Sequence, residues 1–315
     1  MSTYSISKKD ARIRKGSGTS YFYSLTKSLS FVSLILLLAI VISIYLSSKN
    51  VLSWDFIIST DWNPPAKQFG ALTAISGTLI SAVIAIVFAV PLSILCAFFC
   101  SELAPRKLAI LLRGLIDMLA GIPSIIFGFW GLIVFVPFMR DYICPFVNNV
   151  LGSIPLIGSF FQGPPIGIGM LTAGLVLAIM IIPIMTAMII ELLNSVPMQL
   201  KEAAFGLGST RYEVASKVLF PYIKSGVLGS SMLGLGRALG ETMAVTFVIG
   251  NAHVLPTQIL MPATTIASSI ANEFAEATSA AHANALMATG FLLFVITIAV
   301  ILLSRFILAK YSEDH

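Results

Sequence analysis

The sequence has little charge. Only 10% of its 315 residues are Asp, Glu, Lys or Arg, whereas 57% are hydrophobic. A soluble domain carries about 25% charged residues, so this chain lacks the polar groups for a water-exposed surface of its size. Together with a mean hydropathy of +0.95, the composition indicates an integral membrane protein.

Cysteine and histidine are also scarce, with three of each. The cysteines have neither disulfide-framework nor zinc spacing. His253, His282 and His315 are isolated along the chain and lie outside the apolar runs, so no metal site or catalytic constellation is expected. No Gly-rich loop ending in Lys and Ser or Thr is present, and the chain is predicted to bind no nucleotide and no cofactor of its own. It also shows no basic patch for nucleic acid.

A cleavable signal is missing as well. The basic segment Lys8–Lys27 precedes an apolar run that is too long for a signal core, and no small-x-small cleavage site follows it. Residues 1–28 are therefore expected to remain as a basic tail.

Six apolar runs, each near the ~20 residues that a bilayer requires, predict an all-α polytopic protein with six transmembrane helices. The runs cover residues 29–48, 75–99, 111–138, 166–193, 225–250 and 285–308. Gly121, Pro123 and Gly128 interrupt the third. We divide the chain into the tail 1–28, a first helix with its external loop 29–74, a membrane core 75–309 that includes the polar segment 195–224, and a C-terminus 310–315.

Basic residues are distributed unevenly between the flanks of these runs. Fifteen of the 19 Lys and Arg lie in the tail, in two alternate loops and at the C-terminus, whereas only Lys49, Lys67 and Arg140 lie in the opposite flanks. The positive-inside rule then places both termini and residues 195–224 in the cytoplasm. On the other side, Pro and Gly in residues 140–165 predict a surface or re-entrant hairpin whose backbone protein must cover.

The longest polar interruption in the second half of the chain is Glu202–Pro221, EAAFGLGSTRYEVASKVLFP. It is predicted to form two short helices. Gly208 follows the first, Thr210 and Glu213 form a capping box for the second, and Pro221 is expected to end it. A capped, charged helix pair between two membrane spans indicates a docking surface for a partner in water.

Two ionisable residues lie inside the fifth apolar run. Arg237 and Glu241 are four residues apart and are expected to share one helical face, with Arg237 roughly 20 Å from Lys224 and hence near mid-membrane. One interpretation is an anion pathway, because the guanidinium offers donors suited to oxyanions. The other is an ion pair that holds helices together. Intramembrane charges favour the first interpretation.

Three further polar or irregular features are less specific. Arg113 and Asp117 are expected to form an interfacial pair at the cytoplasmic end of the third run. Glu191 is a candidate proton relay, although a structural partner for a loop cation is the favoured interpretation. The stretch Leu119–Gly128, LAGIPSIIFG, fits both a kinked packing site and a hinge in a translocation path.

The cytoplasmic segment resembles the EAA loop of bacterial ABC-importer permeases. The matching residues are Glu202, Ala203, Ala204, Gly208 and Pro221. Val218 and Phe220 stand where the family has Ile and Leu. DWNPPAKQFGAL, LAGIPSIIFG and GRALGETMAVTFVIGNA resemble the permeases of phosphate importers, of the PstC type rather than the PstA type, and the likeness covers nearly the whole chain after the basic tail.

The resemblance implies a type I (MetI-like) importer permease in the lipid of a bacterial inner membrane, without enzymatic activity of its own. Its partners would be a homologous permease (PstA), two copies of an ATPase (PstB) that bind ATP, and an external phosphate-binding protein (PstS). The EAA segment would dock in a groove on the ATPase. Arg237 and Glu241 match positions that the family uses in phosphate passage.

Three alternatives stay open. A permease of the same fold could carry another oxyanion, such as sulfate or molybdate. An ion-driven secondary carrier would use Glu191 and Glu241 as proton sites, but no internal repeat of the kind common in such carriers is visible. A structural or sensory membrane protein is disfavoured by Arg237.

Overall fold

The fold is built of helices throughout the part of the chain that the computed structural model describes, residues 17–155 and 157–313. Six helices are long and apolar enough to cross a membrane, which confirms the prediction of an all-α, six-helix protein. They cover Tyr21–Ser48, Leu72–Leu103, Ser124–Leu151, Met170–Asn194, Arg211–Gly240 and Ala280–Phe306. Most of the basic tail and the last two residues, with His315, lie outside the described residues.

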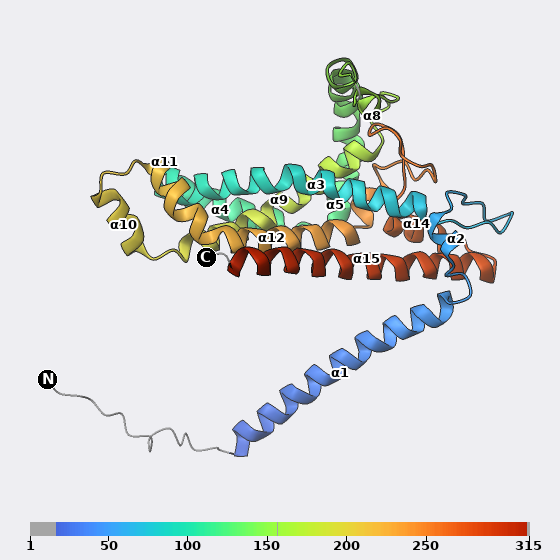
Figure 1. The fold of residues 1–315 in the computed structure, drawn as a ribbon, viewed down its shortest axis with the longest axis horizontal. Helices are drawn as coiled ribbons and strands as arrows, with labels where there is room; N and C mark the ends of the chain where they lie inside the picture. Colours follow the sequence, from blue (N-terminus) through green and yellow to red (C-terminus); the bar gives the residue numbers. More distant parts are fainter. Residues whose placement is uncertain (1–16, 156, 314–315) are drawn as a thin grey trace.

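Four long helices run side by side at the centre of the molecule (Figure 1). They are α3 (Leu72–Phe98), α9 (Met170–Asn194), α12 (Phe220–Gly240) and α15 (Ala280–Glu313). α9 is the most buried of the six spans and packs mainly on α3. Small residues of both helices, among them Ala85 and Ala173, are fully buried in one core cluster, and small side chains of this kind let helix backbones approach closely.

Shorter helices lie at the two ends of this bundle (Figure 1). α10 (Met198–Gly206) and α11 (Arg211–Val214) lie at one end, and α2 (Trp54–Ile58) and α14 (Ile266–Glu273) at the other. α1 (Ser17–Ser48) contacts α15 but otherwise diverges from the bundle, and none of its most apolar stretch is buried. An exposed apolar helix of this length suits contact with lipid.

The third span begins later in the chain than predicted, and its expected range of 111–138 is wrong. Residues Arg106–Ala120 form a separate helix, α4, that ends at Gly121. Pro123 then precedes α5 (Ser124–Trp130), which starts the third span. Pro donates no backbone hydrogen bond and keeps its predecessor out of the helical region, so the break separates two helices instead of kinking one.

The third span winds with a repeat of eight residues. Wide π-helical turns begin at Gly131, Met139 and Val147, and Pro137 and Pro145 lie in short α-helical turns between them. Two turns of an ordinary α-helix take about seven residues, whereas the wide turns add one. The three residues that begin the wide turns are all buried, so they mark one packed face. This span runs across the direction of the four central helices (Figure 1).

Residues 140–165 form the far part of this span and an irregular return segment. The helix continues past Arg140, where the sequence predicts a boundary, to its last π-helical turn. Asn148 Nδ2 donates to the Gly163 carbonyl at 3.1 Å and so ties the return segment to the helix. The helix thus gives the irregular backbone a protein partner, as the hairpin prediction requires.

Candidate functional site

The cation predicted inside the membrane lies on an open helix face. Arg237 occupies the last turn of α12, about 25 Å from the start of that helix. Its side chain is exposed, and no ion pair to it occurs among the described residues. Gly236 and Gly240 have open space where side chains would stand. The guanidinium is therefore accessible to an oxyanion.

Glu241 does not share a helical face with Arg237, and that expectation is wrong. α12 ends at Gly240, and Glu241 has extended backbone with φ −71° and ψ 128°. Its side chain is buried, and Oε1 accepts a hydrogen bond from the Ala244 N–H at 3.3 Å. It thereby caps the short helix α13 (Met243–Thr246), because a carboxylate near a helix N-terminus is stabilised there. The ion-pair interpretation finds no support in the described part of the chain.

Gly128 brings the third span against the segment that holds Glu241. A Cβ at residue 128 would lie 2.8 Å from Ala244 Cα, closer than real Cβ atoms come, so only glycine permits this approach of α5 to α13. Gly121 and Pro123 form the joint between α4 and α5 on the other side. The geometry therefore supports a packing site in the stretch Leu119–Gly128, whereas a hinge in a translocation path stays a prediction.

The helix pair α10–α11, which is predicted to be cytoplasmic, has the predicted caps. Thr210 Oγ1 accepts from the Glu213 N–H at 3.3 Å, and Glu213 Oε2 accepts from the Thr210 N–H at 2.9 Å. Gly208 adopts a left-handed conformation with φ +85°, which an L side chain rarely adopts. Glu202 and Ala203 are exposed, and Leu207 is 88% exposed at the tip between the helices. Met198, Phe205 and Tyr212 of the same two helices are exposed as well, and a group of exposed apolar side chains suits a protein partner.

Pro221 begins a membrane helix and does not end α11, so the predicted boundary is wrong. A π-helical turn, Ala215–Leu219, joins α11 directly to α12, and Pro221 lies in the first turn of α12. The missing N–H of Pro is tolerated at that position because first-turn N–H groups have no intrahelical partner. The second helix of the pair, α11, is therefore continuous with the helix that carries Arg237.

A second core cluster, called here the cytoplasmic core cluster after the predicted orientation, lies at the end of the bundle that carries α10 and α11. Ile189 and Leu193 of α9, Val214 of α11 and Leu219 are fully or almost fully buried there, with Ala204 of α10 packed against them. This cluster is separate from the central core. Movement of the helix pair is thus expected to carry the ends of α9 and α12 with it.

Arg113, Asp117 and Glu191 line one cavity of about 250 Å³. Arg113 Nη2 donates to Ser101 Oγ at 3.4 Å, while its Nε is buried without a partner among the described residues. The expected Arg113–Asp117 ion pair is absent within the described part. With two carboxylates beside one cation, this cavity is poorly suited to an anion.

Two of the histidines belong to a cluster at the opposite end of the bundle, contrary to their isolation in the sequence. His253 Nε2 and His282 Nε2 lie 2.7 and 2.9 Å from the two carboxylate oxygens of Glu273. Trp62 Nε1 donates to Glu273 Oε2 at 2.8 Å and its ring stacks on His253. Nothing in the sequence signals this cluster, because Trp62 is 211 residues from Glu273.

The environment of Glu273 favours its charged form. Burial of the carboxyl group raises its pKa, but hydrogen bonds from His253, Trp62 and His282 lower it by more, so the pKa lies below the ordinary value for Glu. An ionised carboxylate only accepts hydrogen bonds, so the Nε2 atom of each histidine carries a proton. The cluster thereby ties together the segment before α3, the segment before α14, and α15.

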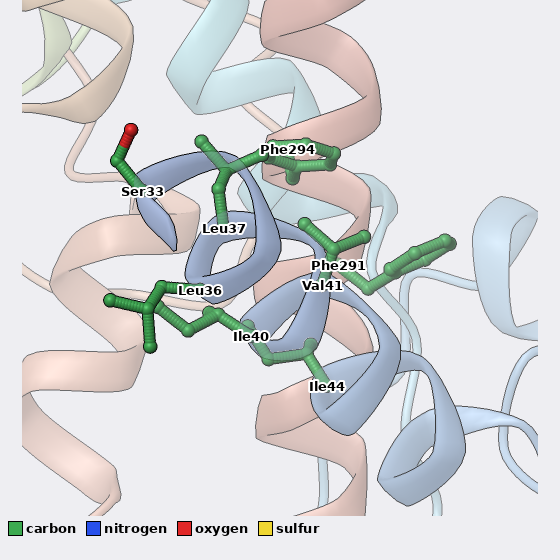
Figure 2. Close-up of a pocket in the computed structure, with 8 residues that line it drawn as sticks. All are labelled: Ser33, Leu36, Leu37, Ile40, Val41, Ile44, Phe291 and Phe294. Carbon is green, nitrogen blue, oxygen red and sulfur yellow. The ribbon is translucent and has the colours of Figure 1, made fainter. Parts of the chain in front are cut away.

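An apolar groove of about 420 Å³ separates α1 from α15 (Figure 2). Leu36, Ile40 and Val41 reach into it from α1, and Phe291 and Phe294 from α15. No charged group lines it, and Ser33 is its one polar lining residue, so it offers an oxyanion no cation. The candidate substrate residue therefore remains Arg237 on α12.

Comparison with known proteins points to one family. Residues 89–315 match the family described as "Binding-protein-dependent transport system inner membrane component". The chain is 50% identical over 300 residues to the phosphate transport system permease protein PstC of Xylella fastidiosa strain Temecula1, covering 94% of this chain and 92% of that protein. The PstC of Haemophilus influenzae is 48% identical, with 93% and 94% covered.

Solved structures support the same fold. A bacterial ABC transporter for import of the acidic polysaccharide alginate aligns with TM-score 0.63 at 16% identity, covering 92% of this chain and 95% of that one. The MetNI methionine ABC transporter in an inward-facing conformation aligns with TM-score 0.50 at 18% identity, covering 76% and 94%. At these identities the likeness concerns the fold alone.

Proposed function

Because the chain belongs to the family of binding-protein-dependent transport system inner membrane components, we propose that it is the membrane-spanning permease of an ATP-driven importer of inorganic phosphate. The chain is a multi-pass inner-membrane protein and a transport subunit rather than an enzyme. The observation that supports an anionic substrate is Arg237, a cation on an open face of a membrane helix. The relatives named PstC support phosphate as the oxyanion.

ATP is bound and hydrolysed by a separate subunit. The exposed helix pair α10–α11, with Glu202, Ala203, Ala204 and Gly208, docks on that ATPase, which is of the PstB type and present in two copies. The other partners are a second permease of the PstA type and an external phosphate-binding protein of the PstS type. Both termini of the chain lie in the cytoplasm, as the basic flanks indicate.

Coupling follows from the continuous helix between the docking surface and the cation. Residues 211–240 form one helical rod, and Arg237 lies about 40 Å along it from Arg211. When two ATPases close, the docked helix pair moves and rotates this rod about the cytoplasmic core cluster. The path then opens to one side of the membrane at a time, and phosphate reaches Arg237 only while the outer side is open.

The test is transport by the complete complex in proteoliposomes. The chain is co-expressed with its partner permease, ATPase and binding protein, and uptake of radiolabelled phosphate is measured. We expect uptake to require ATP on the side of the membrane where the ATPase lies. Uptake should continue when the proton gradient is collapsed, and excess sulfate or molybdate should not inhibit it. Uptake that follows the proton gradient without ATP supports a secondary carrier instead, and displacement by sulfate or molybdate supports another oxyanion.

A further inference from the structure

A salt bridge fastens the cytoplasmic helix pair to a second membrane helix. Lys201 Nζ donates to Glu102 Oε1 at 2.6 Å. Lys201 lies in α10, directly before Glu202, and Glu102 lies in the π-helical turn Phe99–Leu103 that extends the cytoplasmic end of α3. The two side chains are only 14% and 23% exposed. At this depth the charges are weakly screened, and removing either partner leaves the other poorly solvated.

Apolar packing contributes little to the attachment of α10. None of its residues is fully buried, and only Ala204 packs against the cytoplasmic core cluster. Beside the ion pair, a cavity of about 200 Å³ lined by Phe98, Glu102 and Phe205 separates α10 from α3. The salt bridge is thus a point contact, and it can transmit a push or a pull from α10 to α3 without a large packed interface.

The other end of α3 is fastened to α14 on the opposite side of the bundle. Thr78 Oγ1 accepts a hydrogen bond from the Ile266 N–H, the first residue of α14, at 3.0 Å, and Thr78 is buried. A Cβ at Gly77 would collide with the Thr264 carbonyl, so α3 lies directly against the backbone that leads into α14. Displacement of α3 is therefore expected to move α14.

Between these two ends α3 is held to α9. Pro91 interrupts the backbone hydrogen bonds of α3, but close by Ser93 Oγ donates to the Ile182 carbonyl of α9 at 3.3 Å. The helix from Leu72 to Leu103 is unbroken and about 45 Å long. It joins the cytoplasmic helix pair to the opposite end of the bundle.

We propose that Glu102 and Lys201 are positioning residues for coupling: their salt bridge makes α3 move with α10, and α3 carries that movement to α14. This inference rests on the proposed function, in which α10 receives the ATPase stroke. It adds a route beside α12, which ends at Gly240. The route acts at the external side of the path, where α14 and its Glu273 cluster lie.

Charge reversal and charge exchange test the salt bridge. Glu102→Lys, Lys201→Glu and the double exchange are purified in the complete complex, and the phosphate transported per ATP hydrolysed is measured in proteoliposomes. We expect each single variant to lose about tenfold in this ratio, and the double variant to regain it to within about twofold, as coupled pairs do. Glu102→Gln, which keeps the shape and removes the charge, covers the case in which reversal prevents folding.

Three comparisons make the result decisive. Arg140→Glu breaks an exposed pair outside the docking segment, in which Arg140 is 55% exposed, and is expected to leave the ratio unchanged. Thr78→Val removes the acceptor at the outer end of α3 and is expected to lower the ratio with normal assembly. Glu202→Lys tests the docking surface itself.

Single variants at 102 and 201 that assemble and transport with the normal ratio overturn the inference, as does an assembled double variant that stays uncoupled. If Glu202→Lys uncouples while the salt-bridge variants do not, the proposed function stands and the α3 route falls. If the unmodified complex moves no phosphate, the proposed function itself fails.

Discussion

At the scale of single residues, Arg237 carries the substrate proposal. Its side chain is exposed on the last turn of α12 and has no ion-pair partner in the described part of the chain. A charge in the middle of a membrane protein is costly unless it is paired or used. Since Glu241 is occupied in capping α13, the described part of this chain offers Arg237 no carboxylate, and a substrate anion is the natural partner.

We therefore predict that Arg237→Gln reduces phosphate uptake by at least about a hundredfold, equivalent to the loss of a charged hydrogen-bond partner worth about 3 kcal/mol. Insertion and assembly of the complex should be unchanged, because the side chain is exposed. Radiolabelled uptake, with blots of membrane and complex, measures both. Arg140→Gln is the matched control, since Arg140 is also exposed and pairs only with its neighbour Asp141. Normal uptake by Arg237→Gln contradicts the site assignment.

The caps and the cation could be predicted from the sequence because they depend on neighbouring residues. Thr210 and Glu213 are three residues apart, and local backbone geometry alone brings them together. The position of Glu241 could not be predicted in this way. The segment that follows α12 packs at Ala244 against Gly128, which is far away in the chain, and local sequence does not show this contact.

At the scale of elements, the external cluster around Glu273 links three segments. Trp62 precedes α3, His253 precedes α14, and His282 lies in the first turn of α15. All three side chains bond to one carboxylate at the end of α14. α14 is also the element that α3 reaches through Thr78, so the cluster determines how firmly that end of the bundle is held.

We predict that Glu273→Gln lowers the free energy of unfolding by about 1–3 kcal/mol at neutral pH, because buried donors lose a charged acceptor. The folded-state pKa of Glu273 is lowered, so its contribution is fully present above the ordinary Glu pKa of about 4.3 and is lost as the pH falls through the lower folded value. The difference in melting temperature between wild type and variant should therefore shrink below about pH 4.3.

Thermal unfolding of the purified protein in detergent, followed by tryptophan fluorescence at several pH values, measures this difference. Glu276→Gln is the control, since Glu276 is exposed on the segment just after α14. A difference that stays constant down to the lowest pH at which the protein remains folded would show that the charge of Glu273 contributes nothing.

Some helix boundaries could be predicted from the sequence and others could not, depending on the interaction that sets each boundary. Long apolar runs predict four of the six spans in nearly the right place, because burial in lipid needs only length and composition. The third and fifth spans shift because Pro acts differently by context. Pro123 separates α4 from α5. Pro221 lies in the first turn of α12, which a π-helical turn joins directly to α11.

At the scale of the whole molecule, the proposal requires one orientation. The helix pair α10–α11 and the Glu273 cluster lie at opposite ends of the bundle (Figure 1). The sequence places three of the 19 basic residues, Lys49, Lys67 and Arg140, in the external flanks. Of these, Lys67 lines a cavity with Ala281 of α15 near the Glu273 end, and Lys49 directly precedes Asn50 of the same cavity. The separation of the two ends agrees with the charge asymmetry, whereas the direction relative to the cell is a prediction from the positive-inside rule.

Cysteine accessibility tests that direction. In a background without the three native cysteines, Leu207→Cys places a thiol at the tip of the cytoplasmic pair, where Leu207 is 88% exposed. Thr278→Cys places one on the exposed segment between α14 and α15. A membrane-impermeant maleimide should label residue 278 but not residue 207 in spheroplasts, and the reverse in inverted vesicles.

The labelling result decides whether ATP hydrolysis can drive both routes, because it shows on which side of the membrane the helix pair lies. If residue 207 faces the cytoplasm, an ATPase stroke enters at α10, passes along α12 to Arg237, and passes along α3 to the external α14. Labelling of residue 207 from outside would place the docking surface where no ATP is available, and neither route could then be driven by hydrolysis. With residue 207 inside, the two routes start from the same helix pair, so the external end and the substrate cation respond to one input.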